Sequence, residues 1–272
     1  MVHLLSDNLE VAKICIMSMT SGEIDEYSAS LVDIFARSGR ILPLFQLLLG
    51  EESVSVHNCS VDGKTAASKF CTAYSRLIGN EYLQVLLSDL LTEFISNQDL
   101  ELEIQPKILA ADLYSEDDPR ILERLEVNQK HLQEATTIFI NRIIDPDMIA
   151  HLPVELLEII QFVEPERRAA LVSDFLIYKM ISPAIVTPEA YQLLPPDLLP
   201  SRNARRNLVL LTNILRNCVS GKPCGRDNYM SCMNSFITKM HPTLKTHAEK
   251  IVSLPFKKTR TGSCVSLDPF VI

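Results

Sequence analysis

Apolar residues recur every three or four positions over most of this chain, which is the spacing of amphipathic helices. The first run is 9–19, and Ser28 or Ser30 can cap a second run through 31–35. Segment 41–49 is apolar on almost every side and a glycine follows it, so it predicts a buried helix with a glycine cap.

The polar segment 51–64 interrupts this period because it is rich in Ser, Asn, Asp and Gly, the residues of loops. After it we expect one helix from Thr65 through Leu77 and another from near Asn80 through Phe94. The rest of the pattern predicts loops at 97–117 and 187–201 and helices at 118–140, 153–162, 164–182, 203–219, 229–240 and 243–253.

Neither a strand pattern nor an internal repeat interrupts these helices. We therefore expect an all-α fold, with a single helical bundle over residues 1–253 and a tail at 254–272. The chain contains only 8 glycines and no tryptophan, which also favours helices over a turn-rich β fold.

The composition is that of a soluble, reduced protein. We find no run of about 18 uncharged apolar residues that predicts a membrane span, and the first residues do not favour a secretory signal. The 7 cysteines form no C-x-x-C pair, so we expect free thiols and no structural metal. These features predict a cytoplasmic protein.

Charge and motifs exclude several functions. The net charge of −8 argues against nucleic-acid binding, which needs clustered cations. Gly63-Lys64-Thr65 resembles the end of a P-loop, but Asn58 stands where that motif needs its first glycine, and no strand precedes it. Neither a catalytic motif nor a cofactor motif is present, which favours a protein that binds another protein.

The most distinctive segment is 175–188, Phe-Leu-Ile-Tyr-Lys-Met-Ile-Ser-Pro-Ala-Ile-Val-Thr-Pro. Pro183 removes a backbone donor, so we expect the preceding buried helix to end before it. The segment resembles the signature of Ras GTPase-activating (RasGAP) domains, in which an aromatic residue, Leu or Tyr, and Arg precede x-x-Asn-Pro-Ala-Ile-x-x-Pro. Lys179 stands at the position of that arginine.

The resemblance covers about residues 5–252 and is closest to the neurofibromin and IQGAP branches of the family. Segment 60–69, Ser-Val-Asp-Gly-Lys-Thr-Ala-Ala-Ser-Lys, is similar to the family's Leu-Phe-Arg-x-Asn-Ser-Leu-Ala-Ser-Lys. Segments 82–87 and 205–208 also match family helices. The resemblance implies a RasGAP-type helical bundle and a small-GTPase partner of the Ras, Rap, Rho, Rac or Cdc42 type.

The sequence departs from the family at the residues that act on the GTPase. Asp62 stands at the position of the arginine finger, which in Ras–GAP pairs is known to raise the rate by about 10³ to 10⁵. Lys179 keeps a charge but lacks the fork of donors that would hold the finger loop. Val209 and Asn213 replace lysines of relatives.

The site that the resemblance implies is a groove lined by the 51–64 loop and the helix at 203–219. We expect Lys179 and Pro183 to support this groove. The residues expected to lie at the GTPase are Asp62, Gly63, Lys64, Thr65, Arg206, Val209 and Asn213.

Three hypotheses stay open. In the first, the domain binds a GTP-loaded GTPase without much acceleration of hydrolysis. In the second it is a working activator, with Lys64 or the GTPase itself supplying the cation. In the third it is a scaffold with a vestigial groove, and the basic tail at 256–260 makes peripheral contact with the inner face of an anionic membrane.

Overall fold

The computed structural model describes residues 8–51, 66–110, 118–161, 163–225 and 228–255, and all regular structure in these ranges is helical. The predicted all-α fold is therefore confirmed. The helices are α2 (Leu9–Ser18), α3 (Ser21–Arg37), α4 (Ile41–Glu51), α6 (Ala66–Ser96), α7 (Pro106–Leu109), α8 (Pro119–Ile144), α9 (Pro146–Ile149), α10 (Val154–Gln161), α11 (Pro165–Ser173), η1 (Asp174–Ile181), α12 (Ser182–Val186), η2 (Pro188–Tyr191), α13 (Arg202–Ser220), η3 (Tyr229–Met233) and α14 (Asn234–Val252).

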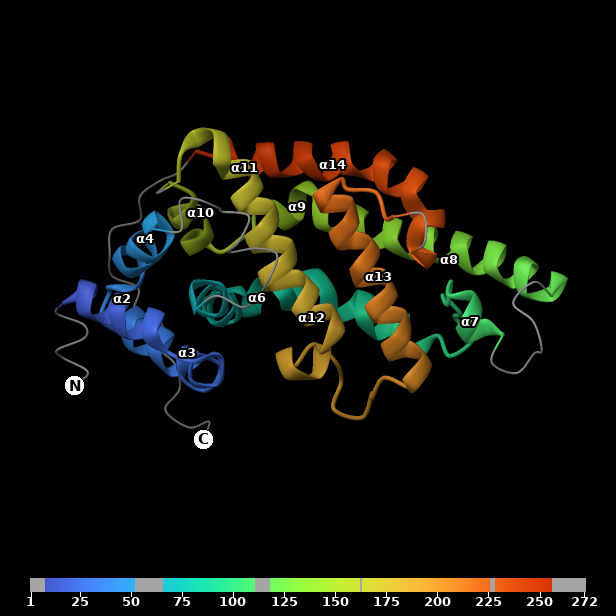
Figure 1. The fold of residues 1–272 in the computed structure, drawn as a ribbon, viewed down its shortest axis with the longest axis horizontal. Coiled ribbons are helices and arrows are strands. Elements are labelled where there is room, and N and C mark those ends of the chain that lie inside the picture. The colour runs from blue at the N-terminus through green and yellow to red at the C-terminus, as the bar shows by residue number, and fades with distance from the viewer. Residues whose placement is uncertain (1–7, 52–65, 111–117, 162, 226–227, 256–272) are drawn as a thin grey trace.

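Helix α3 begins earlier than the sequence pattern predicts. The cap is Thr20 rather than Ser28 or Ser30, because Thr20 and Glu23 bond reciprocally across the first turn. Ser28 is instead buried within the helix. Helices α2, α3 and α4 form one end of the molecule, drawn in blue in Figure 1.

Helix α6 is a single helix of 31 residues, so the predicted break near Asn80 is wrong. Gly79 lies inside it, where a Cβ would meet the Sδ of Met180 at 2.9 Å. The missing side chain lets α6 and η1 approach closely, which offsets the poor helix propensity of glycine.

The two helices predicted at 229–240 and 243–253 likewise become η3 and a continuous α14. Pro242 is exposed there, so water can reach the carbonyl that it leaves free.

The segments α11, η1 and α12 follow one another without a break, so the helix predicted to end at Ser182 continues through Pro183 to Val186. The reason is that η1 is a π-helix, in which the Ser182 N–H donates to the carbonyl of Ile177. This wider turn leaves room for the proline ring. Figure 1 shows the three segments crossing the centre of the molecule.

The helical segment Pro165–Val186 is also long and apolar enough to cross a membrane, by length and composition alone. Its most apolar window is 61% buried inside the bundle. It packs against α6, α13 and α14, which is the behaviour of a core helix.

The loop at 187–201 is ordered, as predicted, because side chains of α6 form hydrogen bonds with the first turn of this loop. Gln84 on α6 donates to the carbonyl of Gln192 at 2.9 Å, and Arg76 donates to the carbonyl of Ala190. The guanidinium of Arg76 also lies 5.0 Å from the centre of the Tyr191 ring.

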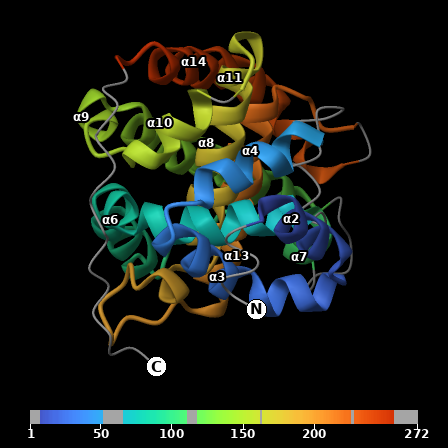
Figure 2. The same cartoon turned by 90° about the vertical axis from the view of Figure 1, so that its left-hand side faces the viewer.

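The buried side chains of α2 to α14 form one extensive apolar core, and a small second cluster lies under α7 and the start of α8. Helix α13 packs against α8, α12 and α14, and Figures 1 and 2 show it within the bundle. The boundary predicted at residue 253 stays a prediction, since most of the tail lies outside the described residues.

Candidate functional site

Lys179 lies on η1 and is buried, with 6% of its surface exposed. Its ammonium donates to the hydroxyl of Ser68, which is fully buried in the first turn of α6. Ser68 lies in the described part of segment 60–69, so this bond ties the end of that segment to η1, the helix of the signature. Asp62, Gly63, Lys64 and Thr65 themselves lie outside the described residues.

Pro183 is half-buried in α12, which packs between η1 and α13. It lies where the π-helical register returns to the ordinary helix. It therefore stands at the point where the chain leaves η1.

Arg206 on α13 is paired inside the domain. Its Nε lies 2.7 Å from Oε2 of Glu103 and its Nη2 lies 3.0 Å from Oε1 of the same carboxylate. Nη2 also donates to Gln105 at 3.3 Å, while Glu103 itself is buried. The hydrogen bonds and charge of Glu103 raise the pKa of Arg206. This arginine therefore braces segment 101–105 against α13, a role that the sequence pattern did not show.

A neighbouring amide strengthens the same brace. Asn207 accepts from the backbone N–H of Leu102 at 3.3 Å and donates to the carbonyl of Leu100 at 2.7 Å. From α8, Asn128 donates to the carbonyl of Glu103 at 2.9 Å. Helices α8 and α13 thus fix this extended segment by satisfying its backbone groups.

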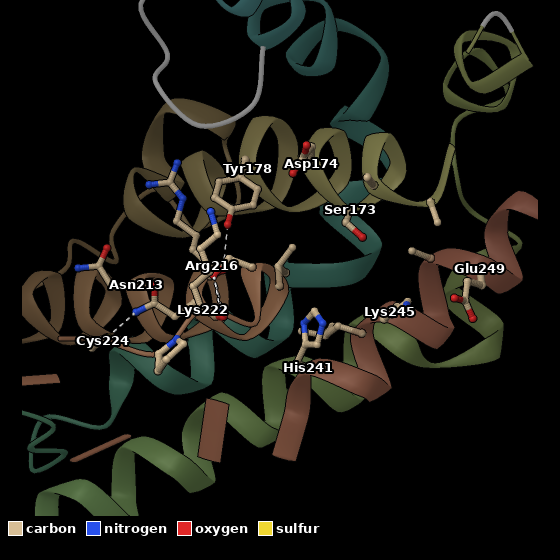
Figure 3. Close-up of a pocket in the computed structure, with 18 of the residues that line it drawn as sticks. Ser173, Asp174, Tyr178, Asn213, Arg216, Lys222, Cys224, His241, Lys245 and Glu249 are labelled. Atoms are coloured by element: carbon tan, nitrogen blue, oxygen red, sulfur yellow. Dashed lines mark hydrogen bonds between the residues drawn. The ribbon is translucent and has the colours of Figure 1, made fainter. Parts of the chain in front are cut away.

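A cavity of about 980 Å³ lies between α11 and η1 on one side and α13 and α14 on the other (Figure 3). Of the residues predicted to contact the GTPase, only Asn213 lines it among those that the structure describes. Val209 is half-buried one turn earlier on α13, outside the cavity lining. Arg206 and Pro183 do not line the cavity either.

The cavity contains an arginine that the sequence reasoning missed. The guanidinium carbon of Arg216 lies 5.0 Å from the centre of the Tyr178 ring, and the Tyr178 hydroxyl donates to the Arg216 carbonyl at 2.9 Å. Burial raises the pKa of Tyr178; nearby Asp174 adds to the shift and Arg216 opposes it. Because Arg216 follows Asn213 by three positions, the helical period alone could have placed both on one face.

The turn after α13 closes one wall of the cavity. Gly221 has φ +64°, and a Cβ there would come within 2.8 Å of the His241 ring. That ring lies in hydrogen-bond contact with the carbonyl of Cys218 at 3.0 Å. Asn234 then holds the following segment by bonding both the backbone N–H and the carbonyl of Cys224, at 2.8 and 3.0 Å.

The described ranges contain no group of three or more His, Cys, Asp or Glu side chains that could hold a metal ion. They do contain a buried lysine bonded to Ser68 at the start of α6 and a cavity with a stacked arginine. This arrangement suits the binding of a polar or charged surface.

Residues 44–220 match the RasGAP family, described as GTPase-activator protein for Ras-like GTPase, so the chain belongs to this family. The family and the likeness to neurofibromin that the sequence motifs predicted are confirmed.

Three relatives show how far the likeness extends. Neurofibromin-A of Dictyostelium discoideum is 37% identical over 260 residues, covering 89% of this chain and 28% of that protein. The inhibitory regulator protein BUD2/CLA2 of Saccharomyces cerevisiae is 24% identical over 91% of this chain and 25% of its own length. Ras GTPase-activating protein gap-2 of Caenorhabditis elegans is 25% identical over 70% of this chain and 16% of its own length. The chain therefore spans little more than a quarter of these relatives at most.

Proposed function

We propose that this domain binds a GTP-loaded small GTPase of the Ras superfamily and stimulates its GTP hydrolysis weakly or not at all. The observation that carries the proposal is the bond between Lys179 and Ser68. This bond holds the start of α6, which follows the finger position in the sequence, and we assign Asp62 to that position. A bond between the signature lysine and α6, together with an acidic residue at the finger position, supports recognition over turnover.

The size of the expected defect follows from the chemistry of phosphoryl transfer. A finger worth about 10³ to 10⁵ in rate corresponds to roughly 4 to 7 kcal/mol of transition-state stabilisation. A carboxylate does not supply this charge, and near the phosphates it has the wrong sign in a poorly screened site. Hydrolysis should therefore proceed near the rate of the GTPase alone.

The proposed contact surface follows the family pattern on this chain. It comprises the finger segment with Asp62, Gly63, Lys64 and Thr65, and the α13 positions Arg206, Val209 and Asn213, supported by Lys179 and Pro183. The partner is a GTPase of the Ras, Rap, Rho, Rac or Cdc42 type. The protein would act in the cytoplasm, with its basic tail at 256–260 available to an anionic membrane.

A second candidate function is a working GTPase activator. It is favoured by the relative named a Ras GTPase-activating protein. In this case Lys64 or a residue of the GTPase would supply the missing cation. Mutating Lys64 abolishes acceleration in the first case and leaves it in place in the second.

The test is a binding screen of the five GTPase types in both nucleotide states, with single-turnover hydrolysis for each type that binds. Selective binding to the GTP-loaded form with little acceleration is the expected result. Asp62→Arg should bind at least as well and accelerate modestly, because Lys179 and Asn213 remain. Failure of every GTP-loaded GTPase to bind would contradict the proposal.

A further inference from the structure

The cavity between η1, α13 and α14 contains an arginine, Arg216, that has one donor without a hydrogen-bond partner among the described residues. The Nε of Arg216 is buried, and within the described residues it has no hydrogen-bond partner. Asp174 lines the same cavity, but no salt bridge between Arg216 and any described carboxylate is present. Arginine carries five donors and cannot lose its charge, so a buried, unpartnered donor is costly.

The position of Arg216 is fixed rather than adaptable. Its guanidinium stacks on the ring of Tyr178, and its backbone carbonyl accepts the hydroxyl of the same tyrosine. Stacking on an aromatic face is a way in which proteins preorganise the planar fork of arginine for a bidentate acceptor. A fixed fork of this kind loses little conformational entropy when it binds a carboxylate.

The cavity wall around Arg216 adds a second cation and an amide. Figure 3 shows Asn213, Arg216 and Lys222 toward one end of the cavity and Glu249 toward the other. Lys222 is exposed just beyond the end of α13, while Asn213 is half-buried one turn before Arg216. An acidic side chain that enters at this end meets three groups that donate hydrogen bonds.

We infer that Arg216 binds a carboxylate side chain on the surface of the GTP-loaded GTPase and supplies much of the binding affinity. This inference rests on the proposed function and deepens it, because it names Arg216, a residue outside the family signature, as the cation that contacts the GTPase. It makes Arg216 a binding residue, with Tyr178 positioning its guanidinium.

The experiment compares wild type with Arg216→Ala, Arg216→Lys and Arg216→Glu in binding to the GTPase that the screen identifies, loaded with a nonhydrolysable GTP analogue. We expect the alanine variant to lose about tenfold or more in affinity, the usual effect of truncating one partner of a desolvated charge pair. The lysine variant should lose less and the glutamate variant more. Arg205→Ala is the matched control, because Arg205 is exposed on the same helix and pairs with Glu189 outside the cavity.

Rescue identifies the chemistry of the partner group. Reversal of one Asp or Glu on the GTPase to Arg should restore binding of Arg216→Glu and weaken binding of wild type. Thermal unfolding of every variant shows whether the domain is intact, and the lysine variant keeps the test valid if the alanine or glutamate variant is unstable.

Three results would overturn the inference. Equal affinity of wild type and Arg216→Ala would show that the arginine does not contact the GTPase. Weakened binding that no carboxylate reversal rescues would assign the contact to another acceptor, such as a phosphate of the nucleotide. If wild type binds no GTPase, the proposed function fails and the inference fails with it, whereas loss of only the arginine effect leaves the proposed function standing.

Discussion

Replacing Arg206 with alanine separates a structural role from a contact role. The variant leaves the Glu103 carboxylate, whose side chain is 7% exposed, without its charged partner. Breaking a fully buried pair in this way costs about 3 to 5 kcal/mol. The Arg206 side chain is 31% exposed, so water screens the pair and we expect a loss of about 2 kcal/mol. For a domain of this size that loss lowers Tm by about 4 to 8 °C.

Thermal and urea unfolding, followed by circular dichroism, measure this loss. Arg205→Ala is the control, since the pair of Arg205 with Glu189 is more exposed and should be worth no more than about 0.5 kcal/mol. An Arg206→Ala variant with unchanged stability would refute the reasoning, because it would show that the pair with Glu103 does not stabilise the domain.

Three further predictions concern stability. Burial lowers the pKa of His247 from 6.5 to about 4, so on acidification the unfolded chain binds a proton before the native state does. The free energy of unfolding should therefore fall by about 2 kcal/mol as pH drops from 6.5 toward 4. Urea titrations at several pH values measure this fall, and His247→Leu should flatten it. Gly221→Ala should cost about 2 kcal/mol in urea unfolding, since φ is +64° and the Cβ would meet His241. Lys179→Met should speed hydrogen exchange in the first turn of α6, because the bond to Ser68 is lost.

A specific result would contradict each of these three predictions. A pH profile of His247→Leu that matches wild type would show that another group causes the fall. Gly22→Ala is the control for Gly221→Ala, because nothing lies within 4 Å of a Cβ added at Gly22. The control variant should unfold at the same urea concentration as wild type or at a slightly higher one. Unchanged exchange near Ser68 in Lys179→Met would mean that the bond does not hold that turn.

Much of the fold was predictable because most helices carry their own start signals. Asp118 caps α8, and prolines stand at the first position of α8 and α11. The pattern failed where tertiary contacts override local preference. Gly79 reads as a break, yet it is the position at which α6 can approach Met180 closely. Pro183 reads as a helix end, yet the π-helical turn before it accommodates the ring.

The candidate site was predictable only in part. The family motif identified Lys179, and the structure places it against Ser68. The partners of Arg206 and Arg216 had no comparable signal. A sequence does not show that Glu103, far away in the chain, pairs with Arg206, or that Arg216 stacks on Tyr178.

The most direct test of the account is single-turnover hydrolysis of GTP by the GTPase that this domain binds, with the domain absent or saturating. The account predicts binding to the GTP-loaded form with an acceleration below about a hundredfold, against about 10³ to 10⁵ for an intact finger. Acceleration above that level by the unaltered domain would contradict it.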